Sequence, residues 1–144
     1  MTPVIRSATF NDGPALVKIE LQSFADPSWD LPSFFKYTCF VAEVHGTIAA
    51  FLVSREVSPA LDGALPQREI LNLAVAPGYR GTGLATALLK HELSLQATHF
   101  LEVRESNLAA QALYRKCGFV VTGRRRGYYE YPPEAAIVMT VKKC

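Results

Sequence analysis

The sequence LNLAVAPGYRGTGLATALLK, residues 71–90, decides the fold because it joins three kinds of local structure. The apolar run over residues 69–76 is typical of a central strand that is covered on both faces. A turn follows that begins at Pro77 and contains several glycines, and a helical apolar pattern then runs from about residue 82 to residue 96. A strand, a glycine-containing turn and a helix in this order indicate an α/β domain.

The rest of the chain continues this mixture of strands and helices. His45-Gly46 predicts a tight hairpin, and the two prolines of ADPSWDLPSFF, residues 25–35, leave room only for a short helix. We expect a mixed, twisted sheet of about six to seven strands with helices on both faces, built as a single domain over residues 1–144. The other expected strands are 4–8, 39–44, 47–57, 100–104, 119–130 and 135–142. The other expected helices are one that is capped by Asn11 or Asp12, with Pro14 in its first turn, and one over 107–117.

The composition excludes several classes of protein. Hydrophobic residues make up 49% and charged residues 19%, which excludes a disordered chain, and a net charge of +2 is too small to predict nucleic-acid binding. Neither a signal-peptide core nor an apolar segment of about 18 residues is present, so we expect a cytoplasmic protein without a membrane partner. Three cysteines without paired spacing indicate reduced thiols, and no ligand spacing predicts a metal site.

The turn after the central strand is a candidate anion site. The first amides of a helix lack intrahelical partners, and Gly81 and Gly83 would let a pyrophosphate approach the backbone. The Walker pattern is excluded because no Gly-Lys pair exists, and the dinucleotide fingerprint fails at Thr86. Arg80, Gly83 and Ala85 satisfy the acyl-CoA pattern [QR]xxGx[GA], although so short a pattern also fits a simple turn.

Two longer stretches favour the acyl-CoA interpretation. From LNLAVAPGYRGTGLATALL (71–89) through LEVRESNLAAQALYRKCGFVVTGRRRGYY (101–129), the sequence resembles the GNAT superfamily of acyl-CoA-dependent N-acyltransferases. Within it, the sequence is most similar to the ribosomal-protein-alanine N-acetyltransferases, which carry LEVR-x-SN, LY-x-x-x-GF and RR-x-YY in this order. The resemblance covers about residues 69–139, half the chain. It implies a GNAT fold, acetyl-CoA as co-substrate without a metal, and direct acetyl transfer to a primary amine, with a protein N-terminal α-amine such as that of a ribosomal protein as the expected acceptor.

The same resemblance implies roles for individual residues. Glu102 corresponds to the general base, and Tyr114 to the general acid that protonates the leaving thiolate. The residues expected to bind the cofactor are Leu73, Ala74, Val75, Arg80, Gly81, Thr82, Gly83, Leu84, Ala85 and Asn107. The residues expected to line the acceptor site are Tyr128, Tyr129 and Glu69.

Each of these residues also has a purely structural interpretation. Glu102 fits a solvated strand carboxylate paired with Arg104 or another cation, and Tyr114 fits a residue packed beside Phe119. Asn107 fits a helix N-cap, a role compatible with cofactor binding. The GRRRGYY stretch, residues 123–129, fits a solvated hairpin or the rim of an acidic-substrate site better than a surface for RNA stacking.

The sequence departs from the family at two places. Gly81 and Thr82 stand where relatives usually carry basic or glutamine side chains, and the segment 24–35 differs from the relatives in a region that builds much of the acceptor site. The resemblance therefore predicts the cofactor and the reaction of this chain better than it predicts the acceptor. The alternatives are an acetyltransferase of small-molecule amines and an acyl-CoA-binding sensor without catalysis; monomer and homodimer are both open.

Overall fold

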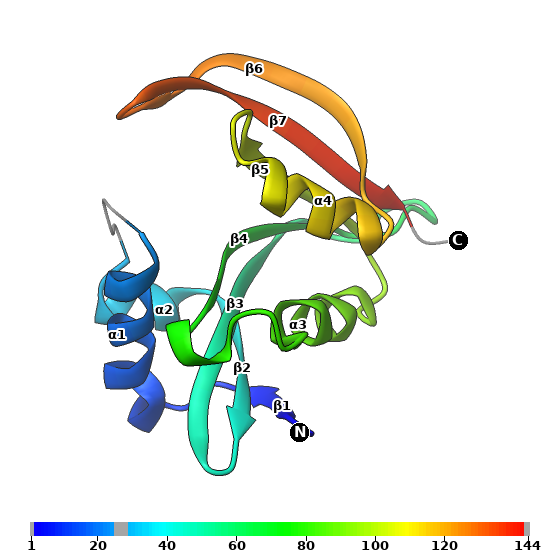
Figure 1. The fold of residues 1–144 in the computed structure, drawn as a ribbon. Helices are drawn as coiled ribbons and strands as arrows, with labels where there is room; N and C mark the ends of the chain where they lie inside the picture. Colours follow the sequence, from blue (N-terminus) through cyan, green and yellow to red (C-terminus); the bar gives the residue numbers. More distant parts are fainter. Residues whose placement is uncertain (1, 25–28, 143–144) are drawn as a thin grey trace. The chain divides into compact units, whose positions relative to one another are not determined.

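The computed structural model describes residues 2–24 and 29–142. Its strands are β1 (Val4–Ser7), β2 (Thr38–Val44), β3 (Thr47–Ser58), β4 (Gln67–Val75), β5 (Thr98–Arg104), β6 (Val120–Glu130) and β7 (Pro133–Lys142). They form one seven-stranded mixed sheet in the order β1-β2-β3-β4-β5-β7-β6 (Figure 1). The helices are α1 (Gly13–Ser23), α2 (Leu31–Lys36), α3 (Leu84–Leu93) and α4 (Leu108–Lys116), with short 3-10 turns η1 (Phe10–Asp12) and η2 (Pro77–Tyr79).

The chain divides into two compact units. The N-terminal unit comprises Met1–Arg55 and Leu71–Ser94, and the C-terminal unit comprises Glu56–Ile70 and Leu95–Cys144. Strand β4 contributes its first residues to the C-terminal unit and its last residues to the N-terminal unit. The expectation of a single domain over residues 1–144 stays a prediction.

In the N-terminal unit, strands β2 and β3 are buried on both faces. Val41 of β2 pairs with Phe51 of β3, and the Phe51 ring packs against Phe34 of α2 with ring centroids 5.0 Å apart. The residue before Val41, Phe40, points to the opposite face and contacts His91 of α3, with centroids 4.5 Å apart. Alternating side chains of one strand thus meet helices on both faces, as predicted.

The turns of this unit follow from their residue types. His45 and Gly46 take φ values of 49° and 77°, which confirms the predicted hairpin between β2 and β3. Helix α2 is short, and the Asp30 Oδ1 caps it by accepting a hydrogen bond from the Ser33 amide at 3.1 Å. The predicted helix over 82–96 is shorter than expected because Gly83, with φ of +88°, precedes its first turn and the helix ends at Leu93. Residues 25–28 of the altered segment lie outside the described residues.

In the C-terminal unit, β5 lies between β4 and β7. It pairs in parallel with β4 from Gln67↔Thr98 to Ile70↔Leu101 and antiparallel with β7, which pairs antiparallel with β6. Leu101 and Val103 point into the core, so the side chain of Glu102 lies on the opposite face, as the alternation predicts. The Gln111 side chain of α4 donates hydrogen bonds to the backbone at the end of β5 and thereby fixes this helix.

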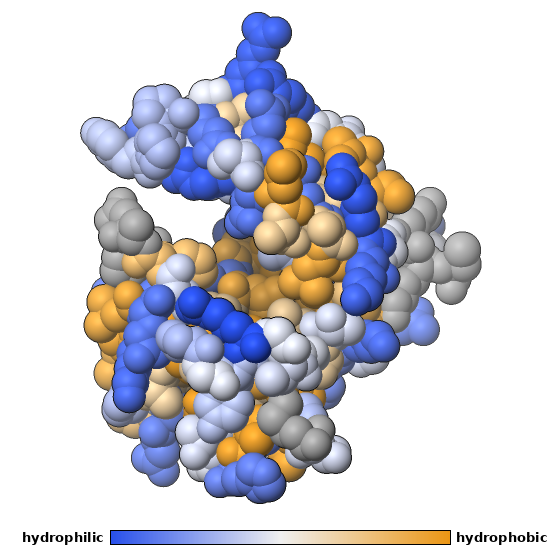
Figure 2. Space-filling model, in the orientation of Figure 1, coloured by the Kyte–Doolittle hydropathy of each residue, from blue (hydrophilic) through white to orange (hydrophobic). Residues whose placement is uncertain are grey.

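Strand β6 lies at the edge of the sheet and carries three consecutive arginines, Arg124–Arg126. Hydrophilic residues cover the β6–β7 hairpin in the view of Figure 2, and most residues of β6 are exposed. Gly118, with φ of +102°, ends α4 as predicted, and Phe119 then enters the core before β6 begins.

Candidate active site

The loop between β4 and α3 has an open, glycine-dependent backbone. Gly81 and Gly83 have φ values of +77° and +88°, and a Cβ built at either would find no atom within 4 Å. No described side chain caps α3, and its first backbone hydrogen bond runs from the Ala87 amide to the Gly83 carbonyl at 3.0 Å. The amides of Leu84 and Ala85 precede that bond, so they lack intrahelical partners and suit an anionic ligand.

The side chains of this loop stabilise the loop itself. The Arg80 guanidinium donates from Nε to the Val75 carbonyl at 3.0 Å and from Nη2 to the Ser23 Oγ at 3.3 Å. The Thr82 hydroxyl donates to the Tyr79 carbonyl. Both groups thus fix the course of the backbone in this structure, and their contact with a pyrophosphate stays a prediction.

The last residues of β4 lie beyond its ladder with β5. The final pair of that ladder is Ile70↔Leu101, and Leu73, Ala74 and Val75 follow it. Ala74 is buried in the N-terminal unit, whereas Leu73 and Val75 are partly exposed. Backbone groups at such positions can pair with an extended ligand as an added strand would.

Glu102 is a mostly buried carboxylate whose two oxygen atoms have different surroundings. Oε1 accepts a hydrogen bond from Nη1 of Arg125 at 2.9 Å. Oε2 is buried and accepts no hydrogen bond from any side chain or amide of residues 2–24 or 29–142. The structural alternative, pairing with Arg104 or another cation, is confirmed for another cation, because Arg125 is the partner and Arg104 binds elsewhere. A buried acceptor without a partner is costly, so Oε2 is a natural site for a donor on a substrate.

Two tyrosines of β6 lie next to this carboxylate. Burial raises the pKa of Tyr128, and the Glu102 and Glu69 carboxylates raise the pKa further. Burial also raises the pKa of Tyr129 to about 12, with a smaller effect from the Tyr128 phenol. The two rings meet edge to face with centroids 5.0 Å apart. The structure therefore brings together three predicted acceptor-site residues and the predicted base.

Arg104 holds the tip of the β6–β7 hairpin. Its guanidinium donates to the carbonyl oxygens of Tyr131 (2.8 Å) and Pro132 (3.0 Å) and pairs with Glu134 at 3.2 Å. Its Cζ also lies 4.2 Å from the centroid of the Tyr129 ring. Arg104 thus packs against the face of Tyr129, one of the residues predicted to line the acceptor site, a contact that the sequence did not reveal.

Tyr114 is a protonated phenol within the same unit. Burial raises its pKa to about 12, and Tyr129 and Cys117 add smaller effects in the same direction. Its ring packs edge to face against Phe119, with centroids 5.7 Å apart. The packing alternative is therefore confirmed, and it leaves a phenol that keeps its proton throughout the neutral range.

Asn107 caps helix α4. Its Oδ1 accepts a hydrogen bond from the Ala110 amide at 3.1 Å, which confirms the N-cap interpretation. Its predicted contact with the pantetheine arm stays a prediction.

Comparison with known proteins identifies the family. Residues 14–119 match the model of the Acetyltransferase (GNAT) family. The chain belongs to the GNAT family. It is 37% identical over 149 aligned positions to the [ribosomal protein bS18]-alanine N-acetyltransferase of Escherichia coli (strain K12), with 95% of each chain covered. The crystal structure of the ribosomal-protein-S18-alanine N-acetyltransferase from Escherichia coli matches with a TM-score of 0.81 at 34% identity, covering 99% of this chain and 96% of that one.

A third match concerns the fold alone. Arabidopsis thaliana NAA60 in complex with acetyl-CoA matches with a TM-score of 0.85 at 18% identity, covering 99% of this chain and all of that one. The GNAT fold and the N-acetyltransferase class, both predicted from the motifs, are confirmed. In the described ranges, no helix is long and apolar enough to cross a membrane, and no three metal-ligating side chains cluster.

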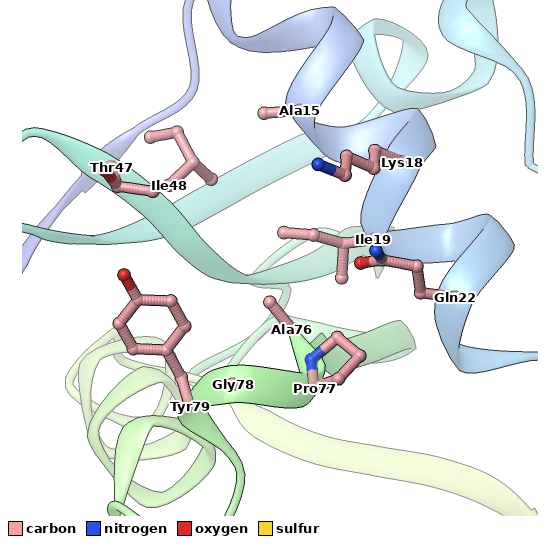
Figure 3. A pocket seen from close by; sticks show the side chains of 10 residues that line it. All are labelled: Ala15, Lys18, Ile19, Gln22, Thr47, Ile48, Ala76, Pro77, Gly78 and Tyr79. Carbon is pink, nitrogen blue, oxygen red and sulfur yellow. The ribbon is translucent and has the colours of Figure 1, made fainter.

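This GNAT chain also has a cavity that the sequence did not predict. It is an open pocket of about 330 Å³ in the N-terminal unit, and Lys18 and Ile19 extend from α1 toward Ile48 of β3 across it (Figure 3). None of the predicted cofactor or acceptor residues lines it. Its lining residues are Ala15, Lys18, Ile19, Gln22, Thr47, Ile48, Ala76, Pro77, Gly78 and Tyr79.

Proposed function

We propose that this N-acetyltransferase uses acetyl-CoA to acetylate the N-terminal α-amine of a protein, with Glu102 as general base. One observation carries the proposal: the Glu102 carboxylate is largely buried, its Oε2 has no donor within the described ranges, and two tyrosines lie around it. The identity to the Escherichia coli enzyme named for ribosomal protein bS18 supports a protein N-terminus as acceptor, a ribosomal protein among the candidates. It equally supports a cytoplasmic location.

Acetyl-CoA fits the loop geometry of the chain. The uncapped start of α3 offers the amides of Leu84 and Ala85 to a pyrophosphate, and Gly81 and Gly83 leave open space where a Cβ would stand. Leu73–Val75 offer strand backbone to the pantetheine arm. The loop carries less side-chain charge than is usual in the family, so its affinity for the cofactor depends mainly on backbone amides.

An α-amine suits a carboxylate base at neutral pH. The reference pKa of an α-amino group is about 7.7–8.0, whereas that of a lysine side chain is about 10.4. Glu102 accepts the proton that the ammonium must lose, directly or through one water, and passes it to solvent. The free amine nitrogen then forms the C–N bond to the thioester carbonyl carbon as the C–S bond breaks.

Tyr114 completes the proton balance. Its phenol donates a proton to the departing thiolate, and the nitrogen that has become an amide releases its remaining surplus proton, which restores the phenol. A Tyr114 pKa of about 12 lies above that of a thiol, about 8.5. Proton transfer from Tyr114 is therefore unfavourable as a separate step, and it must accompany C–S bond cleavage.

A peptide panel tests the proposal. The purified enzyme and acetyl-CoA are offered an alanine-starting hexapeptide with an internal lysine, the same peptide with a blocked N-terminus, spermidine and an aminoglycoside. CoA release and mass spectrometry then locate the acetyl group. We expect a single acetyl group on the alanine nitrogen; preferred acetylation of lysine or of a small amine would contradict the α-amine assignment, and cofactor binding without transfer would indicate a sensor.

A further inference from the structure

The base of the proposed function forms an ion pair with an arginine of its own chain. Glu102 Oε1 accepts the hydrogen bond from Arg125 at 2.9 Å, and the two side chains differ greatly in exposure. The Glu102 side chain is 12% exposed, whereas that of Arg125 is 57% exposed. The carboxylate is thus a fixed, largely buried group, and the guanidinium reaches it from the solvent side.

Arg125 reaches Glu102 across an intervening strand. Both residues lie on strands that pair with β7, where Arg125 pairs with Ala136 and Glu102 pairs with Val138. The β6–β7 register is irregular between Arg125 and Tyr129, and Gly127 there has φ of +60°. This break in the ladder leaves Arg125 at the edge of regular pairing, next to the acceptor-site tyrosines.

The guanidinium of Arg125 is held by few contacts. Among the described residues it donates one hydrogen bond, to Glu102, and its Cζ lies 4.5 Å from the centroid of the Tyr128 ring. Arg104, by contrast, binds two carbonyl oxygens, one carboxylate and one ring. Arg125 can therefore leave its partner at far smaller cost than Arg104.

We propose that Arg125 occupies the place of the acceptor's ammonium before the acceptor binds, and that the acceptor binds by exchanging its own cation for the guanidinium. This inference rests on the proposed function, because it takes Glu102 as the group that receives the amine. A primary ammonium has three donors, so it can replace the Arg125 bond at Oε1 and also satisfy the buried Oε2. The Tyr128 ring face serves either cation.

The exchange has a consequence for specificity and product release. Only a cationic acceptor can replace the ion pair that Glu102 loses when Arg125 leaves, so an uncharged N-terminal group binds poorly. After transfer, the nitrogen is a neutral amide that forms no ion pair. Arg125 then returns to Glu102 and favours departure of the acetylated product.

Two variants at Arg125 and one matched control test the exchange. Arg125→Gln removes the competing cation, Arg125→Lys retains a cation, and Arg124→Gln removes a neighbouring arginine whose partner is Glu105 on the surface. The Kd of an alanine-starting hexapeptide is measured by calorimetry with saturating CoA, together with the KM for the peptide and inhibition by its N-acetylated form. A thermal melt of each variant shows that it is folded.

Arg125→Gln is expected to lower the peptide Kd and KM about threefold and to strengthen inhibition by the acetylated peptide about as much, as removal of one partly exposed competing ion pair predicts. Arg125→Lys and Arg124→Gln should keep wild-type values. An unchanged or higher Kd in Arg125→Gln, or an equal decrease in Arg125→Lys, would overturn the exchange. Failure of the wild type to acetylate the peptide's α-amine would instead overturn the proposed function, so the two failures are distinguishable.

Discussion

Arg104→Met removes the group that fixes the tip of the β6–β7 hairpin. The change breaks hydrogen bonds of 2.8 and 3.0 Å to two carbonyl oxygens, an ion pair of 3.2 Å to Glu134 and a stacking contact on Tyr129. Each interaction is partly exposed, so water replaces some of each, and we estimate a loss of about 2 kcal/mol in the local stability of the hairpin tip. At 1.36 kcal/mol for each factor of ten, this corresponds to about 30-fold faster local opening.

Hydrogen exchange followed by mass spectrometry measures that opening directly. Peptides that cover residues 128–135 should exchange about 30-fold faster in Arg104→Met, while peptides of the N-terminal unit keep their wild-type rates. The KM for the acceptor peptide should rise because Tyr129 loses its support, and the KM for acetyl-CoA should not change. Arg126→Met, at an exposed arginine of the same hairpin, is the control. Wild-type exchange at the tip in Arg104→Met would refute the positioning role.

Three further predictions concern the loop and the titrating groups. Gly83→Ala places a Cβ at φ of +88°, a conformation that costs an L residue about 1–2 kcal/mol. The free loop can relax to avoid this cost, whereas binding must restore the loop, so the Kd for acetyl-CoA in a direct binding assay should rise about tenfold. An unchanged Kd would contradict a requirement for positive φ at this position in the bound loop. The folded-state pKa values of Tyr114 and Tyr129 are raised from 10.0 to about 12. The stability that depends on protonated phenols is therefore complete below pH 10 and is lost between pH 10 and 12. Thermal melts should show Tm falling in that range, and a flat Tm would contradict the burial of both phenols. The hydrogen bond from Arg6 lowers the pKa of Asp12 from 3.8 to about 2, so stability should fall as pH drops through that range, and Asp12→Asn should reduce this acid dependence in the same assay.

Local patterns predicted much of the fold. The His45-Gly46 pair predicted its hairpin, and the alternation in β5 predicted that Glu102 lies opposite Leu101. The end of helix α3 was not predicted, because the apolar row continues past Leu93 to Leu95 in the sequence although the helix has ended. Periodicity describes which residues can face a core; it does not say where the backbone leaves the helix.

The ion-pair partner of Glu102 could not be predicted from the spacing of residues in the sequence. Arg104 is two positions away and is a plausible partner on the same strand face, yet it binds the tip of the hairpin. Arg125 reaches Glu102 across β7 because the β6–β7 ladder contains register shifts. Such shifts depend on how three strands pack together, and no local pattern in GRRRGYY predicts them.

The most direct test of the account is the acetyl-transfer activity of Glu102→Gln compared with Glu105→Gln, a surface carboxylate that pairs with Arg124. Both variants are assayed on the alanine-starting hexapeptide by mass spectrometry, and acetyl-CoA binding is measured alongside. Loss of a general base predicts that kcat/KM falls about 10²–10⁴-fold in Glu102→Gln, with acetyl-CoA affinity unchanged and Glu105→Gln fully active. Full kcat/KM in Glu102→Gln would contradict the central role given to this carboxylate.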